Sequence, residues 1–158
     1  MVVIADTSPI NYLVLIDQIG ILPKLYTRVV IPPAVCEELT SAAAPSPVRE
    51  WTERRPSWLE VIHPKATIVL EQLDPGESQA IALVAELGAG VLLIDELAGR
   101  QEAARRGIRV AGTLAVLDEA DRAGFLQFDE AVAGLRETSF RASEAVLAEI
   151  QRKRRGLR

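Results

Sequence analysis

Two aspartates each follow a short run of apolar residues, and this position makes them candidates for a binding or catalytic site. Asp6 follows residues 2–5 and Asp95 follows residues 91–94. Such runs are typical of strands buried in a parallel sheet. Ligands of open parallel α/β sheets bind at the carboxyl ends of the strands. Helix capping is the simpler role for one such aspartate, but two at equivalent strand ends favour a shared site.

Two glutamates extend the pattern to four carboxylates. Glu38 lies on a predicted helix after the second strand, and Glu77 lies in the first turn of a later helix, where it could simply favour the helix dipole. Carboxylates from separate segments can surround a hard cation such as Mg²⁺ or Mn²⁺, and without one they repel one another. Such a site lowers the pKa of water and offsets charge on a phosphoryl group without a histidine base. The sequence therefore predicts Asp6, Glu38, Glu77 and Asp95 as metal-binding, catalytic residues.

The other residue types exclude several chemistries. One cysteine, Cys36, and one histidine, His63, permit no internal disulfide and no Cys/His zinc site. No G-x-x-x-x-G-K-[ST] motif is present, which excludes a phosphate-loop NTPase. A net charge of −4 argues against a protein that binds nucleic acid over its whole surface. An aromatic content of 4% argues against a surface on which nucleic-acid bases stack.

The elements that must position the four acids alternate along the chain. Strands are predicted over residues 2–5, 28–31, 59–62, 91–94 and 108–111. The helices between and after them are predicted from residue 8, from residue 34, and over 48–55, 74–87, 97–106, 114–123, 129–137 and 142–153. This alternation is typical of βαβ units and of a parallel sheet covered by helices on both faces. We expect one domain over residues 1–150.

A basic tail is predicted over residues 151–158. A solvated, frayed helix end is the favoured interpretation, and an arm that contacts phosphate is the alternative. Arg100, Arg105 and Arg106 either contact RNA phosphates or pair with Glu96 and Glu102 on a solvated face. The chain shows no signal-peptide pattern and no apolar stretch long enough to span a bilayer, so we expect a cytoplasmic protein without a membrane partner.

Several segments together resemble the PIN-domain ribonucleases, including the toxins of type II toxin–antitoxin modules. The resemblance covers nearly the whole chain, and it is carried by the order and spacing of the motifs more than by any one of them. The matching segments are Ile4-Ala5-Asp6-Thr7-Ser8-Pro9, Pro33-Ala34-Val35-Cys36-Glu37-Glu38-Leu39, Pro75-Gly76-Glu77-Ser78-Gln79-Ala80-Ile81-Ala82, Leu92-Leu93-Ile94-Asp95-Glu96, Gly112-Thr113-Leu114 and Phe140-Arg141-Ala142-Ser143.

The resemblance implies a PIN-like three-layer α/β fold and a Mg²⁺- or Mn²⁺-dependent endoribonuclease that cleaves RNA through metal-activated water. It matches Asp6 and Asp95 to the family's metal-binding acids, and Glu38 to the acid on the helix after the second strand, with Glu37 as the fallback. Glu77 stands where many toxins have aspartate. A toxin role, an antitoxin partner and a homodimer are also implied, whereas the number of metal ions stays open.

Some residues in or beside these motifs differ from the family pattern or allow more than one role. Many family members carry a further aspartate soon after the one matched by Asp95, and here only Glu96 is available, which we interpret as a helix-start acid. Thr7 and Thr113 either hydrogen-bond the acids or cap helices, and for Thr113 we expect capping. The main alternative to an enzyme is a non-catalytic PIN-like module that binds metal or protein.

Two further classes of protein, one an enzyme and one a signalling domain, fit less well. A phosphatase with an aspartyl intermediate, which would resemble the haloacid dehalogenases, needs a second aspartate where this chain has Ser8. A phosphoacceptor receiver domain needs a lysine after its last strand, where this chain has Gly112 and Thr113.

Overall fold

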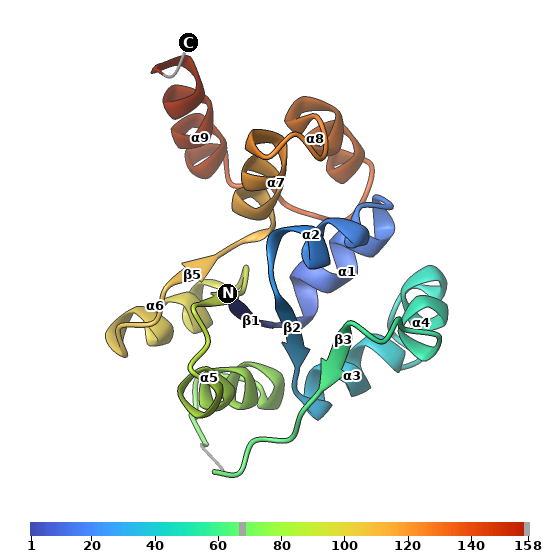
Figure 1. Cartoon of the computed structure of the whole chain (residues 1–158), viewed down its shortest axis with the longest axis vertical. Coiled ribbons are helices and arrows are strands. Elements are labelled where there is room, and N and C mark those ends of the chain that lie inside the picture. The colour runs from blue at the N-terminus through green and yellow to red at the C-terminus, as the bar shows by residue number, and fades with distance from the viewer. Residues whose placement is uncertain (67–68, 157–158) are drawn as a thin grey trace.

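The computed structural model describes residues 1–66 and 69–156, and within them five parallel strands form one sheet across the middle of the molecule (Figure 1). The strands are β1 (Val2–Ala5), β2 (Arg28–Ile31), β3 (Leu59–Val61), β4 (Val91–Leu93) and β5 (Val110–Ala111). Their order is β3-β2-β1-β4-β5, and each neighbouring pair is parallel. The predicted α/β class and all five predicted strands are confirmed, although β3, β4 and β5 are shorter than predicted.

Helices cover both faces of this sheet. They are α1 (Thr7–Leu15), the 3₁₀ helix η1 (Ile19–Ile21), α2 (Leu22–Leu25), α3 (Pro33–Thr40), α4 (Ser46–Glu53), α5 (Pro75–Leu87), α6 (Leu97–Arg105), α7 (Thr113–Arg122), α8 (Phe128–Arg136) and α9 (Glu144–Gly156). Successive strand residues point to opposite faces. Ile4 and Leu92 therefore pack with α5 and α6 on one face, and Val3 and Leu93 pack with α1 and α7 on the other. The predicted three-layer architecture is confirmed.

Local sequence explains where the helices that carry the acids begin. In α5, Asp74 occupies the N-cap position and its Oδ1 atom accepts a hydrogen bond of 2.8 Å from the backbone amide of Glu77. Pro75 stands at the first helical position, where its missing N–H costs nothing. The helix ends at Gly88, whose φ of 60° lies in the left-handed region that glycine adopts readily. These signals fix Glu77 in the first turn.

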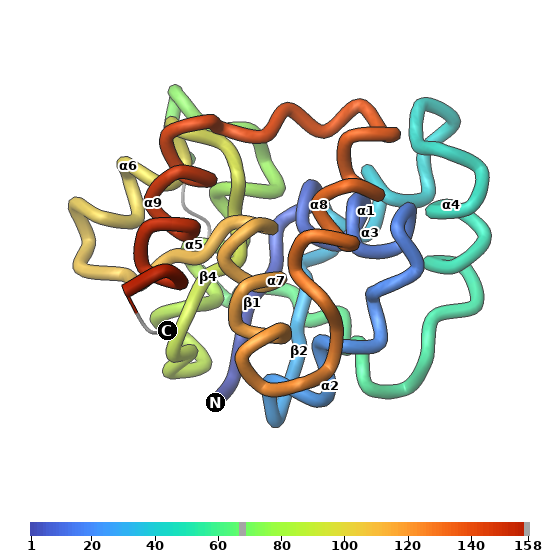
Figure 2. Tube along the Cα trace, turned by 90° about the horizontal axis from the view of Figure 1, so that it is seen from above, coloured from blue at the N-terminus to red at the C-terminus, as the bar shows by residue number. Residues whose placement is uncertain are grey.

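The structure adds elements that the sequence did not predict. The short helices η1 and α2 connect α1 to β2. At the other end of the chain, α8 and α9 both pack against α7 (Figure 2). No helix in the described ranges combines the length and the apolar character needed to cross a membrane.

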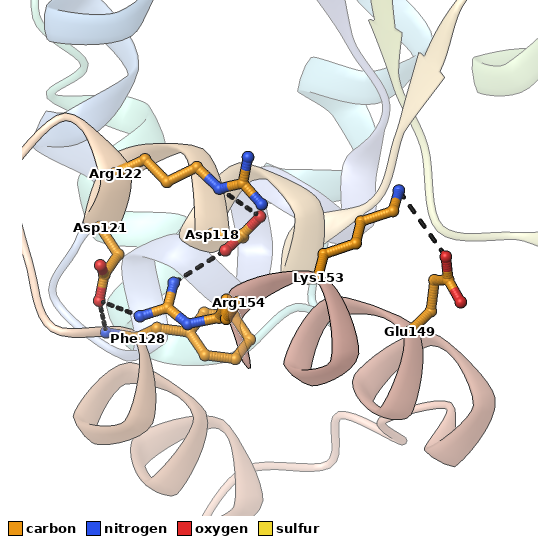
Figure 3. A network of polar contacts seen from close by, with 7 residues as sticks. All are labelled: Asp118, Asp121, Arg122, Phe128, Glu149, Lys153 and Arg154. Atoms are coloured by element: carbon orange, nitrogen blue, oxygen red, sulfur yellow. Dashed lines mark hydrogen bonds and ion pairs between the residues drawn. The ribbon is translucent and has the colours of Figure 1, made fainter. Parts of the chain in front are cut away.

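The C-terminal helix α9 continues past its predicted end to Gly156, so the basic residues up to 156 belong to it. Arg154 donates a hydrogen bond of 2.8 Å to Asp118 and lies 3.0 Å from Asp121, both on α7, and its guanidinium carbon lies 5.0 Å from the ring centroid of Phe128 (Figure 3). Arg154 is thus docked, in contrast to the solvated tail that was predicted. Arg158 of that tail lies outside the described residues.

Candidate functional site

The four predicted acids all lie near the carboxyl ends of the central strands. Asp6 follows β1 directly, and its backbone amide donates a hydrogen bond of 2.9 Å to Leu93 of β4. Asp95 follows β4 after one further residue. Glu38 comes from α3 and Glu77 from the first turn of α5. The parallel sheet therefore brings segments that are distant in sequence to one edge, as the strand order requires.

Asp6 is buried and only partly satisfied. Its exposed fraction is 3%, and it makes no side-chain cap hydrogen bond although it occupies the N-cap position of α1. Its Oδ1 atom has no hydrogen-bond partner among the described residues. Burial raises the pKa of Asp6 to about 8; the charges of Asp74, Glu77 and Glu38 add to the rise, and the amide of Thr7 opposes it. An unpaired charge here is costly unless a cation joins it.

Glu37 and Glu38 are both exposed on α3, but only Glu38 is held toward this cluster, whereas the Glu37 side chain makes no hydrogen bond with the described residues. The Thr7 hydroxyl donates a hydrogen bond of 2.7 Å to Oε2 of Glu38. Its Oε1 atom approaches Gly76 so closely that a Cβ there would lie 3.0 Å away. Loss of surrounding water raises the pKa of Glu38, the Thr7 hydroxyl lowers it, and the Asp74 charge raises it.

Glu77 is 6% exposed, and its backbone amide donates a hydrogen bond to Asp74, which the sequence predicts only as the start of a helix. Burial raises the pKa of Glu77 to about 7, and the adjacent Asp74 and then Glu96 contribute to the rise. Glu96 itself occupies the N-cap position of α6, in keeping with a helix-start acid. Spacing is the signal that could have identified Asp74, because an N-cap acid three residues before a first-turn glutamate places two carboxylates at one helix end.

Asp95 is held differently from the other acids. Its Oδ1 accepts a hydrogen bond of 2.8 Å from the backbone amide of Thr113, and its Oδ2 accepts one of 2.7 Å from the Thr113 hydroxyl. Burial raises the pKa of Asp95, while both Thr113 donors and the charge of Arg100 lower it. The prediction that Thr113 is a helix cap is wrong, since Gly112 occupies the N-cap position of α7 and the threonine side chain binds the acid instead.

Thr113→Val is expected to lower the free energy of unfolding by about 1–3 kcal/mol, because it leaves a carboxylate oxygen of Asp95 without its donor. Valine has nearly the same shape as threonine, and Thr113 is fully buried. Thr52→Val is the matched control: this threonine is equally buried, but its hydroxyl bonds only the helix carbonyl of Val48. Urea unfolding at pH 7 measures both variants, and equal losses would contradict a specific role for the Thr113 hydroxyl.

The donor set suits a hard divalent cation. As the side chains stand, no three Asp, Glu, His or Cys residues within 1–66 and 69–156 form a group that could hold a metal ion. Mg²⁺, however, usually keeps several waters and takes only one or two carboxylates directly. Asp6 offers a buried oxygen without a partner, and Glu77 and Glu38 supply further negative charge beside it. These residues fit Mg²⁺ or Mn²⁺ by their chemistry.

Comparisons with known proteins agree with this fold. A family model described as PIN domain matches residues 2–155. Among solved structures, the chain is similar to a PilT N-terminus domain protein from the hyperthermophilic archaeon Sulfolobus solfataricus P2, with a TM-score of 0.53, 16% sequence identity, and coverage of 90% of this chain and 100% of that one. That likeness supports the fold alone. The search of curated proteins found no match. On the family match over residues 2–155, this chain belongs to the PIN domain family.

Proposed function

We propose that this protein is a Mg²⁺- or Mn²⁺-dependent endoribonuclease whose site is formed by Asp6, Glu38, Glu77 and Asp95, with Asp74 beside them. PIN domains are usually metal-dependent nucleases, which supports nuclease activity in general. The observation that carries the proposal is the buried Oδ1 atom of Asp6, which has no partner among the described residues and lies within a group of carboxylates. Such a group retains its charge only with a bound cation, and takes up protons otherwise.

The residues of this chain have separable tasks in that function. Asp6 and Glu77 provide buried negative charge, and Thr7 holds Glu38 in place through its hydroxyl. Thr113 fixes the orientation of Asp95 by two hydrogen bonds. A divalent ion, when bound, would lower the pKa of the attacking water and offset the negative charge on the phosphoryl group. The proposed reaction breaks one phosphorus–oxygen bond of RNA by addition of water.

RNA as the substrate rests on the resemblance of the sequence motifs. The toxin role, the antitoxin partner, the homodimer and the cytoplasmic location stay predictions. A non-catalytic metal-binding or protein-interaction module is the second candidate function. It is favoured by two observations. No three acids of the described part of the chain lie close enough together to hold a metal ion. Both carboxylate oxygens of Asp95 already accept hydrogen bonds from Thr113.

Glu38→Gln is expected to slow RNA cleavage by about a hundredfold, since it removes a charge beside the metal. Glu37→Gln is the matched control, because this neighbour on α3 is exposed and does not contact the other acids. The measurement is the initial rate of cleavage of a labelled mixed RNA pool with Mn²⁺, with Mg²⁺ and with EDTA.

Each outcome of that measurement separates the two candidates. Metal-dependent cleavage that is lost in Glu38→Gln and kept in Glu37→Gln supports the nuclease. Cleavage that survives EDTA contradicts metal dependence. No cleavage under any condition, together with Mn²⁺ binding detected by calorimetry, favours the binding module.

A further inference from the structure

A groove of about 470 Å³ lies beside Asp95, next to the carboxylate site. Its walls come from the start of α6, from β5 and the start of α7, and from the segment that leads into α9. The volume lies within the range of about 300–1,000 Å³ that is usual for small-ligand sites. The side chains that matter for its chemistry are Asp95, Leu97, Arg100, Phe140, Arg141 and Ser143.

Arg100 is the most informative residue of this groove. It is partly buried, yet its side chain forms no hydrogen bond or ion pair with any described residue. The other partly buried arginines of the described ranges all have partners: Arg28 binds Glu60, Arg49 binds Ser46, and Arg154 binds Asp118 and Asp121. A guanidinium has five donors and cannot lose its proton. Arg100 thus presents unused donors to the groove.

The backbone next to Arg100 leaves room for its guanidinium group. A Cβ at Gly112 would lie 2.9 Å from Nη1 of Arg100 and 2.9 Å from Oδ1 of Asp95. The φ of Gly112 is −86°, which any residue can adopt. The absence of a side chain is therefore what allows the close approach, and it keeps the floor of the groove open between the arginine and the aspartate.

The remaining lining combines a second cation with apolar surface. Arg141 is exposed and has no ion-pair partner in the described part of the chain, and Ser143 adds a hydroxyl at the start of α9. Asp95 is the one acid among the lining residues. Leu97, at 68% exposed, and the Phe140 ring offer apolar contact. Two arginines beside apolar side chains suit a phosphodiester joined to a nucleoside.

From these contacts we infer that the groove binds one nucleotide of a single-stranded RNA, with its phosphate on Arg100 and Arg141 and its sugar or base against Leu97. This inference deepens the proposed function and rests on it, because the groove meets the carboxylate site at Asp95. The strand then leaves the metal site over the start of α6 and the segment before α9. Net acidity of the chain does not oppose this, since the groove itself carries more positive than negative charge.

The test measures binding of a short labelled single-stranded RNA by fluorescence anisotropy in an Asp6→Asn background with Mg²⁺ present. Arg100→Gln and Arg141→Gln are each expected to raise Kd about tenfold at low salt, as for loss of a charge-assisted hydrogen bond. Each should also reduce the slope of log K against log salt by about 0.7, the value for one phosphate contact in a single strand. Leu97→Ser should weaken binding and leave that slope unchanged. Arg105→Gln, whose side chain already binds Glu102 on the same helix, should bind as the parent does.

The possible results are distinct from those for cleavage. If the two arginine variants bind RNA as tightly as the parent, the inference is overturned, even if the wild-type protein cleaves RNA. If their binding falls with the expected salt slopes and the wild type cleaves nothing, the groove stands and the nuclease falls. A parent that binds no RNA, or one from which inorganic phosphate displaces RNA as effectively as unlabelled RNA does, overturns the inference as well.

Discussion

Asp6→Asn is expected to lower metal-dependent RNA cleavage by about a thousandfold or more, since it removes the most buried charge of the site. Asparagine has the same shape as the protonated aspartate, so the residue still fits its pocket after β1. The same change is expected to stabilise the metal-free protein. Loss of function and gain of stability in one variant is the pattern expected of a residue that is strained in the absence of its ligand.

The stability gain follows from the raised pKa of Asp6. An unfolded aspartate ionises near pH 3.9, whereas the folded protein holds this proton until about pH 8. Below the unfolded pKa the group has no effect, and the stability of the folded protein falls as the pH rises between these two values. At pH 8 without metal, Asp6→Asn should therefore gain up to about 5 kcal/mol, or about 10–20 °C in Tm. Glu77 titrates in part of the same range, so the variant should reduce the pH dependence without removing it.

Thermal unfolding in EDTA between pH 5 and 9, a range that spans the titration of Asp6, measures the stability effect. Cleavage rates in Mn²⁺ measure the effect on activity. Asp129→Asn is the matched control, because this aspartate is exposed on α8 and has no partner in the described ranges. A variant that keeps wild-type cleavage would remove Asp6 from the site. A variant that is less stable than wild type at pH 8 would show that the metal-free carboxylate is satisfied by contacts other than those described here.

Arg154→Met is expected to lower the free energy of unfolding by about 2 kcal/mol. It removes the hydrogen bond to Asp118, the ion pair to Asp121 and the contact with the Phe128 ring, while methionine retains part of the apolar stem (Figure 3). Both aspartates lie on α7, so their loss of a shared cation should loosen the attachment of α9. The effect concerns stability and lies apart from the carboxylate site.

Arg155→Met is the control, because the next residue of α9 is exposed and makes no ion pair with the described residues. Urea unfolding gives the stability difference, and amide hydrogen exchange of α9 shows whether the helix opens locally. Equal stabilities of the two variants would mean that the Arg154 contacts contribute nothing measurable, as many exposed ion pairs do.

Short-range patterns were sufficient to predict most of the fold. The apolar run of β1 and the sequence Asp74-Pro75-Gly76-Glu77 before α5 contain their own start and stop signals, and both elements lie where they were expected. The helices η1 and α2 are too short to show an apolar period, and the one start signal of α2 is the proline Pro23 in its first turn. The last turn of α9 was predicted to fray because nothing in the sequence shows that Arg154 reaches α7.

The site could be predicted only as a set of residue types. Position after a strand identified Asp6 and Asp95, but the orientation of each carboxyl group depends on distant neighbours. Thr113 begins α7 two residues after β5, so its hydrogen bonds to Asp95 require the pairing of β4 with β5. Whether Asp6, Glu38, Glu77 and Asp95 bind metal stays a prediction.

The strand order also constrains when the site can exist during synthesis. β1 is made first, yet it pairs with β4 as well as β2, so Val3 meets Val91 across most of the chain. Closing so long a loop is entropically costly and slow compared with local helix formation. Asp95 reaches Asp6 only after β4 has left the ribosome and joined the sheet. A nascent chain that ends before this strand carries Asp6, Glu38 and Glu77 but not Asp95, so an incomplete product of translation would lack one acid of the proposed site.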